Sequence, residues 1–289
     1  MLTALFFQLV NRSPKGRKIA FRHLFEFLAR RSGHVTDWTQ MNYGYAGDGE
    51  DPYTIALAPE DEAERYCHQL YLNAVGGFDL IGRDVVEVSC GRGGGARFVH
   101  KYLHPRTVTG LDIAAGAVGF CRQVHRANGL RFLQGDAEEL PLFDESADAV
   151  INVEASFCYG DFEAFLAEVR RVLRPGGLFL FTDLRHTEEV DGLSAALTGS
   201  GLELLERTDI TENVVRALDL DSARRMAGVR ALAPRFMRHA MAAFAGTPGS
   251  RIPTLLSDGR MRYLSFVLRK PVNANATIAE QSVICAEAA

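Results

Sequence analysis

The sequence lacks the cysteine pattern of a secreted or metal-binding protein. Its 289 residues include five cysteines, and no pair has the spacing of a zinc site or belongs to an even disulfide framework. Such scattered thiols favour a reducing cytoplasm. His100 and His104 lie four residues apart, but no Cys or carboxylate accompanies them, so we predict no metal site. The cysteines are Cys67, Cys90, Cys121, Cys158 and Cys285.

Long apolar runs and a basic surplus are also missing. No stretch approaches the roughly 20 residues that are needed to span a bilayer. Residues 1–10 are apolar, yet no basic residue precedes them and no small-residue cleavage site follows, which disfavours a signal peptide. We expect no stable membrane insertion, although this first helix could touch a membrane surface or an apolar substrate. The net charge of −4 disfavours a nucleic-acid partner.

What the chain does contain is an alternation of apolar strands and amphipathic helices. This alternation is typical of an α/β fold, with a parallel sheet covered by helices on both faces. A helix over residues 162–173 is expected to end at the turn Pro175-Gly176-Gly177, and another helix is expected over residues 222–245. The expected strands are residues 85–88, 107–111, 131–133, 149–153, 178–183, 201–206 and 263–269.

We divide the chain into three parts. Residues 1–75 carry helical patterns and are expected to form an N-terminal helical lid. Residues 76–272 form the α/β domain, with a helical insertion at about 210–255 before the last strand. Residues 273–289 are small and polar and are expected to be a flexible tail.

A glycine-rich loop follows the first expected strand. Residues 87–95 read EVSCGRGGG, and glycine lets the backbone pass close to a ligand and turn sharply into a helix. The pattern Gly91-x-Gly93-x-x-Ala96 also satisfies the dinucleotide fingerprint, so the loop alone predicts a nucleotide-type cofactor without naming it. Asp112 ends the next strand, where a carboxylate can accept hydrogen bonds from both hydroxyls of a ribose.

Two later motifs help to decide whether this nucleotide-type cofactor is a dinucleotide. Residues 135–141 (GDAEELP) and 173–177 (LRPGG) resemble those of class I S-adenosylmethionine (SAM)-dependent methyltransferases. In that family an Asp after the third strand accepts from the adenine amino group, and the next backbone N–H reaches a ring nitrogen. The resemblance therefore implies these roles for Asp136 and Ala137 and a Rossmann-like seven-stranded sheet. It disfavours a nicotinamide-dependent dehydrogenase.

Shorter stretches are similar to one particular family, the mycobacterial phthiotriol/phenolphthiotriol dimycocerosate methyltransferases. The similarity covers roughly residues 38–270 and includes VSCG at 88–91, NVEAS at 152–156 and DLR at 183–185. It implies SAM-dependent transfer of a methyl group to a hydroxyl oxygen of a bulky, apolar lipid, polyketide or other secondary metabolite. Whether the chain is a monomer or a homodimer is left open.

The resemblance also implies a set of cofactor-binding residues. Tyr43, Tyr45 and Tyr71 are candidates to cover the methionine end of the cofactor, and simple packing within a lid is the alternative for each. The complete set of implied cofactor-binding residues is Tyr45, Glu87, Ser89, Gly91, Gly93, Asp112, Ile113, Asp136, Ala137, Asn152 and Val153.

Two residues depart from the usual methyltransferase pattern. Ser89 replaces the first glycine of the cofactor loop, as it does in the mycobacterial family. Phe157 stands where the family commonly has a His that would serve as general base. An alcohol acceptor needs such a base, which is worth a factor of about 10² to 10⁴ in rate.

The candidate catalytic residues are therefore Asp183 and Glu154, which end the fifth and fourth expected strands at the ligand-binding edge. Asp183 could instead form a cap or a salt bridge with Arg185, and His186 is a weaker substitute for the missing His. A phenol, enol or carboxylate acceptor would need no base, and Phe157 would then be part of the pocket wall. The alternatives to O-methylation are therefore a C-methyltransferase or a non-methylating cyclase with the SAM fold.

Overall fold

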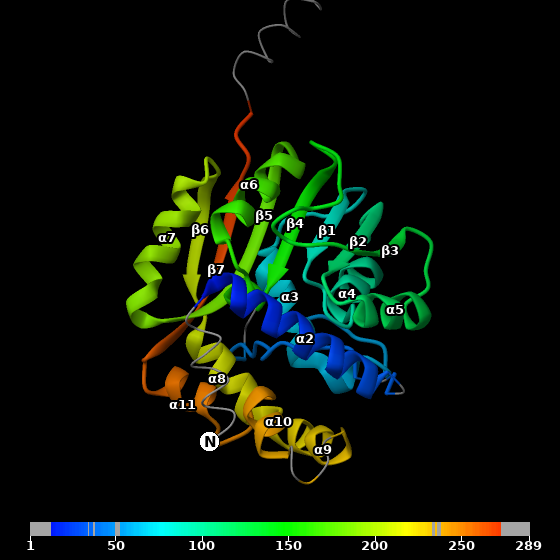
Figure 1. Cartoon of the computed structure of the whole chain (residues 1–289), viewed down its shortest axis with the longest axis vertical. Coiled ribbons are helices and arrows are strands. Elements are labelled where there is room, and N and C mark those ends of the chain that lie inside the picture. Colours follow the sequence, from blue (N-terminus) through cyan, green and yellow to red (C-terminus); the bar gives the residue numbers. More distant parts are fainter. Residues whose placement is uncertain are drawn as a thin grey trace, which may run out of the picture.

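The computed structural model describes residues 13–33, 35–36, 38–49, 53–232, 235 and 238–272. A seven-stranded sheet with the order β3-β2-β1-β4-β5-β7-β6 lies at the centre of this part of the chain (Figure 1). The first five strands are parallel, and β7 is antiparallel to both of its neighbours. The strands are β1 (Asp84–Val88), β2 (Thr107–Asp112), β3 (Leu130–Gln134), β4 (Ala147–Val153), β5 (Leu173–His186), β6 (Glu203–Asp209) and β7 (Met261–Arg269).

Each face of the sheet has its own hydrophobic core, as the prediction of an α/β sheet covered on both faces requires. Successive residues of a strand point to opposite faces, so Leu180 belongs to one core and Phe181 to the other. The first core is completed by α3 (Arg65–Val75), α4 (Gly94–Tyr102) and α5 (Ala115–Val124). The second is completed by α6 (Phe162–Val172) and α7 (Val190–Gly199).

Strand β5 starts earlier than the sequence predicts. Leu173 pairs with Ala147 and Leu178 pairs with Ala149, so the intervening turn residues bulge out of the ladder without ending the strand. Gly176 has a φ of +79°, and its N–H donates to the carbonyl of Lys270 just beyond β7. The prediction of a helix-ending turn followed by a fresh strand was wrong here, because pairing with a distant strand keeps the turn within the sheet.

At its other end β5 reaches past the neighbouring strand. The last pair between β4 and β5 joins Val153 to Thr182, whereas β5 continues to pair with β7 as far as His186 and Met261. Four further residues at the usual rise of a strand amount to about 13 Å. The β5–β7 ladder therefore projects beyond the carboxyl end of β4 and stands beside the edge where the site is expected.

The N-terminal helix and the insertion lie at this same end of the sheet. Helix α2 (Pro14–Ser32) crosses the sheet next to the carboxyl end of β4, and α8 to α11 lie beyond it (Figure 1). The oxygen Oγ of Ser13 accepts from the N–H of Gly16, and Pro14 provides a first helical residue that needs no N–H partner. The insertion contains α8 (Thr211–Leu220), α9 (Ser222–Leu232), α10 (Arg238–Phe244) and α11 (Arg251–Ser257).

The insertion also corrects one prediction. The single helix expected over residues 222–245 is two helices, α9 and α10. The expected first helix at residues 1–10 and the tail at 273–289 lie outside the described residues. Within the described ranges, every helix is too short or too polar to cross a bilayer.

Candidate active site

The glycine-rich loop leaves β1 in a sharply turned conformation. Ser89, Gly91 and Gly93 have φ values of +62°, +54° and +76°. This left-handed region favours glycine, which explains why methyltransferases commonly have glycine where this chain has Ser89. The hydroxyl of Ser89 lies 2.7 Å from Oη of Tyr159. Ser89 thus keeps the turn of a glycine and gains a hydrogen-bond partner.

The loop is crossed closely by other parts of the chain. A Cβ at Gly95 would lie 2.0 Å from the ring carbon Cζ of Tyr71, and one at Gly94 would lie 2.7 Å from the carbonyl oxygen of Thr39. Any side chain at either position would displace its neighbour. The loop is therefore a cradle of backbone atoms, and Tyr71 and Thr39 pack directly against it.

Glu87 is buried in the floor of this cradle. Its Oε1 accepts from the hydroxyl of Tyr71 at 2.5 Å, while its Oε2 has no hydrogen-bond partner among the described residues. Burial raises the pKa of Glu87 to about 8, although the hydrogen bonds from Tyr71 and from the N–H of Ala96 lower it. A buried oxygen without a donor is suited to a ligand that brings one.

Asp112 ends β2 and is also buried. Its Oδ2 accepts from the N–H of Gly91 and its Oδ1 from the N–H of Ala114, both at 2.9 Å. Because a carboxylate offers about four acceptor positions, each oxygen can still accept one more hydrogen bond. Burial raises the pKa of Asp112 to about 6. The next residue, Ile113, accepts from the Gln134 amide through its carbonyl.

Asp136 lies directly under the N-terminal helix. The ammonium group of Lys18 on α2 is 2.5 Å from Oδ2 of Asp136 and 2.7 Å from Oε2 of Glu138. Oδ1 of Asp136 accepts from the N–H of Glu138 at 3.0 Å, and Ala137 is buried between these two residues. The predicted adenine contact is therefore tied to α2 by an ion pair, and sequence reasoning did not include Lys18.

Residues 38–46, which we call the strap, run from α2 toward the site. The guanidinium of Arg92, in the glycine-rich loop, donates to the carbonyl oxygens of Trp38 and Val35. Glu64 accepts from the N–H groups of Thr39 and Gln40. Arg92 and Glu64 were not predicted as site residues, because their partners in the strap are distant in sequence and are mostly backbone groups, which leave no sequence pattern.

The tyrosines of the strap take two different positions. The N–H of Tyr43 donates to Glu154, and its hydroxyl donates to the carbonyl of Phe244. Tyr45 is buried, with its ring edge-on to Tyr53 at 5.8 Å. The ring of Tyr45 thus packs against other residues of this region, as one of the two alternatives stated, and its contact with a cofactor stays a prediction.

Glu154 follows β4 and is half-buried, with a φ of +50°. Its Oε1 accepts from the N–H of Tyr43 at 2.8 Å and from the hydroxyl of Tyr263 at 2.6 Å. Burial raises the pKa of Glu154 to about 7, these hydrogen bonds oppose the shift, and the charge of Asp183 adds to it. A carboxyl group with such a pKa is suited to take up a proton at neutral pH.

Asp183 is completely buried, and donors surround its carboxylate. Oδ2 accepts from the N–H and the hydroxyl of Ser156 at 2.9 and 2.5 Å, and Oδ1 accepts from the N–H of Leu184. The guanidinium of Arg185 lies 3.1 Å from Oδ2. The salt bridge considered as an alternative is thus present, and catalysis by Asp183 stays a prediction.

Asn152 and Phe157 complete this edge of the sheet. The amide of Asn152 donates to the carbonyl of Val88 and to the hydroxyl of Tyr159, while its Oδ1 has no partner among the described residues. Val153 ends β4 beside Thr182. The ring of Phe157 contacts Phe21 of α2 edge-on at 5.8 Å, so it forms a wall where a His is common.

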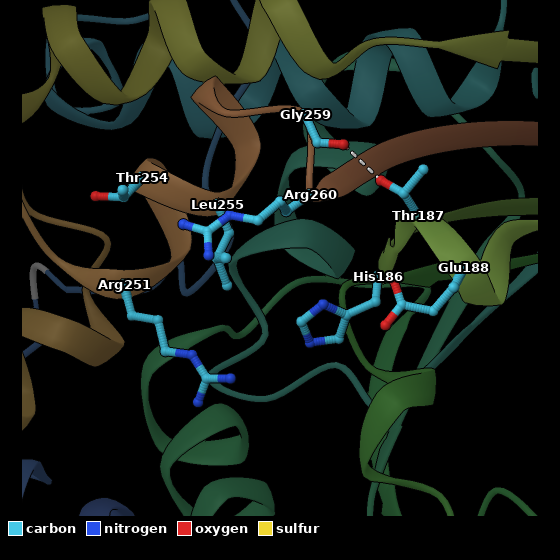
Figure 2. Close-up of a pocket in the computed structure, with 8 residues that line it drawn as sticks. All are labelled: His186, Thr187, Glu188, Arg251, Thr254, Leu255, Gly259 and Arg260. Carbon is cyan, nitrogen blue, oxygen red and sulfur yellow. Dashed lines mark hydrogen bonds between the residues drawn. The ribbon is translucent and has the colours of Figure 1, made fainter.

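His186 lies in different surroundings from Glu154. It lines a cavity of about 570 Å³ at the end of the β5–β7 ladder, together with Arg251 and Arg260 (Figure 2). None of the predicted cofactor-binding residues lines this cavity. Across the described ranges there is also no group of three His, Cys, Asp or Glu residues that could hold a metal ion.

Comparison with known proteins identifies similar sequences along most of the chain. A model described as a methyltransferase domain matches residues 86–181. A phthiotriol/phenolphthiotriol dimycocerosates methyltransferase of Mycobacterium tuberculosis is 38% identical over 253 residues, which cover 88% of this chain and 93% of the relative. A fatty-acid O-methyltransferase of Mycolicibacterium smegmatis is 37% identical over 259 residues, which cover 90% and 91%.

Solved structures show the same fold at lower identity. The (4+2)-cyclase SpnF is similar with a TM-score of 0.67 and 20% identity, over 88% of this chain and 96% of that one. A geranyl diphosphate C-methyltransferase from Streptomyces coelicolor is similar with a TM-score of 0.61 and 16% identity, over 88% and 98%. These matches confirm the predicted seven-stranded Rossmann-like sheet.

The buried carboxyl of Glu87 gives a testable dependence of stability on pH. Its folded pKa of about 8 lies above its ordinary value of 4.5, so the folded protein retains a proton that the unfolded chain has released between these pH values. The stability from this group is complete below pH 4.5 and is lost as the pH rises to 8, by an amount on the order of a few kcal/mol. Urea unfolding of the ligand-free protein at pH 5, 6.5 and 8 measures the loss.

We expect Glu87→Gln to flatten this decline, because the amide still accepts from Tyr71 but does not titrate. Glu139→Gln is the matched control, since Glu139 is exposed. An unchanged pH dependence in Glu87→Gln would show that Glu87 is ionised throughout this range.

Proposed function

Because the chain belongs to the phthiotriol/phenolphthiotriol dimycocerosates methyltransferase family of SAM-dependent methyltransferases, we propose that it methylates a hydroxyl oxygen of a bulky, apolar acceptor. The acceptor class is a lipid, polyketide or other secondary metabolite. The observation that carries the proposal is Glu154, a half-buried carboxyl with a pKa of about 7 at the carboxyl edge of the sheet. The relatives support the acceptor class, since their names refer to a long-chain lipid and to a fatty acid.

The residues around the cradle fit SAM. Asp112 has a spare acceptor position on each oxygen for the two ribose hydroxyls, and Oε2 of Glu87 lacks a donor. SAM supplies a methyl group on a positively charged sulfur, which a nucleophile displaces in line. We propose that Asp136 contacts the adenine amino group, which requires it to share or release Lys18. Further proposed contacts are Tyr45, Ser89, Gly91, Gly93, Ile113, Ala137, Asn152 and Val153.

Glu154 is the better candidate for the general base. A base must reach the acceptor hydroxyl and be ionised near the working pH. Glu154 is partly exposed, whereas Asp183 is completely buried and already accepts from Ser156, Leu184 and Arg185. We therefore assign proton removal to Glu154 and the positioning of Ser156 and Arg185 to Asp183.

The surroundings of this base support an apolar acceptor. The ring of Phe157 contacts Phe21, Phe21 stacks on Phe25 at 6.0 Å, and Phe25 meets Phe244 edge-on at 6.3 Å. This row of rings joins the segment after β4 to α2 and α10. Such a surface excludes water and favours acyl chains or rings over polar acceptors.

Phe157 also supports a second candidate function. Without a His at this position the site resembles one that methylates carbon or binds SAM without transferring its methyl group. A carbon nucleophile is deprotonated only after attack, so a wall residue would not impair it. Glu154 is the reason we place O-methylation first.

Incubation of the purified chain with SAM labelled in its methyl group tests the function. We expect label in long-chain alcohols, phenols or fatty acids and none in short polar alcohols, with products identified by mass spectrometry. Label on carbon would favour the second candidate, and SAM binding without any turnover would favour a non-methylating protein. Binding of NAD without binding of SAM would contradict both.

Loss of the Asp112 carboxylate should weaken cofactor binding. Asp112→Ala leaves the ribose hydroxyls without acceptors, which costs roughly 1–3 kcal/mol, or about 5- to 150-fold in the Kd for SAM. Calorimetric titration at pH 7.5 measures this change. Asp112→Asn, which retains one carbonyl oxygen, covers the case in which the alanine variant misfolds, and the exposed Asp219→Ala is the control. Unchanged affinity in both Asp112 variants would refute the assignment.

Removal of the base should slow turnover without loss of cofactor. We expect Glu154→Gln to lower kcat by about 10² to 10⁴ with an alcohol acceptor, while the Kd for SAM changes little. In the unmodified protein kcat should fall below pH 7, as Glu154 becomes protonated. Asp183→Asn should lower thermal stability yet retain that pH profile. The assignment would be reversed, with Asp183 as the base, if Glu154→Gln kept full kcat or if Asp183→Asn abolished the dependence of kcat on pH.

A further inference from the structure

Helix α2 has an inner face that is fully engaged with the site. Lys18 pairs with Asp136 and Glu138, and Phe21 contacts Phe157. Glu26 accepts from the N–H of Gly116 at the start of α5. These contacts fix which side of α2 points away from the protein.

The outer face carries cations and large apolar side chains but no exposed carboxylate. Ile19 and Phe27 on this face are 57% and 46% exposed. They lie eight residues apart, about two helical turns, and therefore on the same side of α2. Among the described side chains of the helix, glycine and Pro14 aside, the exposed ones are Lys15, Ile19, Arg22, His23, Phe27, Arg30 and Arg31.

The charge of α2 contrasts with the charge of the whole chain. The helix contains six Lys and Arg residues and one acidic residue, Glu26, whereas the chain has a net charge of −4. Glu26 accepts from the N–H of Gly116 and pairs with Arg30 at 3.0 Å, so it offsets one of the six positive charges. Positive charge is thus concentrated where the two exposed apolar side chains lie.

We propose that this outer face of α2 binds the surface of an anionic lipid membrane. Helices that lie in the headgroup region place apolar side chains below the surface and cations among the lipid phosphates. Ile19 and Phe27 supply the apolar contacts, and Lys15, Arg22 and Arg31 have long stems that can reach the headgroups beside them. An acidic protein partner would use the same cations but would leave two isolated apolar side chains unexplained.

Two further features fit a membrane surface. Residues 1–10, which precede α2 in sequence, contain no charged side chain. The inner face of α2 also touches Phe157 at the carboxyl edge of the sheet, so one helix joins the lipid surface to the site. An apolar acceptor held in the membrane would then reach the site along α2. The membrane contact itself does not depend on methyl transfer.

Sedimentation of the full chain with vesicles tests the proposal. The vesicles are phosphatidylcholine alone or phosphatidylcholine with 30 mol% phosphatidylglycerol (a composition of about one anionic lipid in three), in low and moderate salt. We expect binding to the anionic vesicles only. The double variant Lys15→Gln with Arg22→Gln should bind about 25-fold more weakly, at about fivefold for each charge. Phe27→Ser should also weaken binding to the anionic vesicles, and the binding that remains should be more sensitive to salt.

Arg170→Gln with Arg207→Gln is the matched control, because it removes two cations from α6 and β6. Its affinity for the anionic vesicles should stay within about twofold of the unmodified chain. Circular dichroism and SAM affinity report whether each variant folds.

Three results would overturn the proposal. In the first, the chain remains in the supernatant with anionic vesicles, and in the second, the control variant loses as much binding as the α2 variant. In the third, Phe27→Ser leaves binding unchanged while soluble polyglutamate competes fully, which would identify α2 as a surface for acidic proteins. Each result is independent of whether labelled SAM transfers its methyl group.

Discussion

The burial of three carboxyl groups at one edge of a parallel sheet is the constraint on which the site depends. Glu87, Asp112 and Glu154 lie at the carboxyl ends of β1, β2 and β4, and burial raises the pKa of each. Desolvating a carboxyl group is unfavourable unless donors replace the lost water. These donors come from α3, the glycine-rich loop, the strap and β7. The segments that surround the site therefore also offset the cost of desolvating its carboxyl groups.

This constraint explains how the strap is positioned. The N–H of Tyr43 and the hydroxyl of Tyr263 meet at one oxygen of Glu154, although the three residues come from the strap, β7 and the end of β4. Arg92 and Glu64 hold the preceding residues of the strap mainly through its backbone, and each also contacts one side chain, Trp38 for Arg92 and Thr39 for Glu64. The path of the strap is therefore fixed by buried charges on both sides of it.

Local pattern was enough to predict the sheet and much of the cradle. Alternating apolar runs located all seven strands, and the glycines with Asp112 and Asp136 marked the turns at the carboxyl edge, because both depend on residues close in sequence. Their contacts with a cofactor stay a prediction. The bulge at Gly176 and the break within residues 222–245 were missed, since pairing and packing with distant segments decide them. Lys18 belongs to the same class, because its partners are more than a hundred residues away.

The ion pair between Lys18 and Asp136 couples two parts of the proposed site. Lys18 lies on the helix that also carries Phe21 against the wall residue Phe157. Any movement of α2 that frees Asp136 must also shift this wall. The ion pair at Asp136 and the ring contact at Phe157 therefore cannot loosen independently, because α2 carries one partner of each.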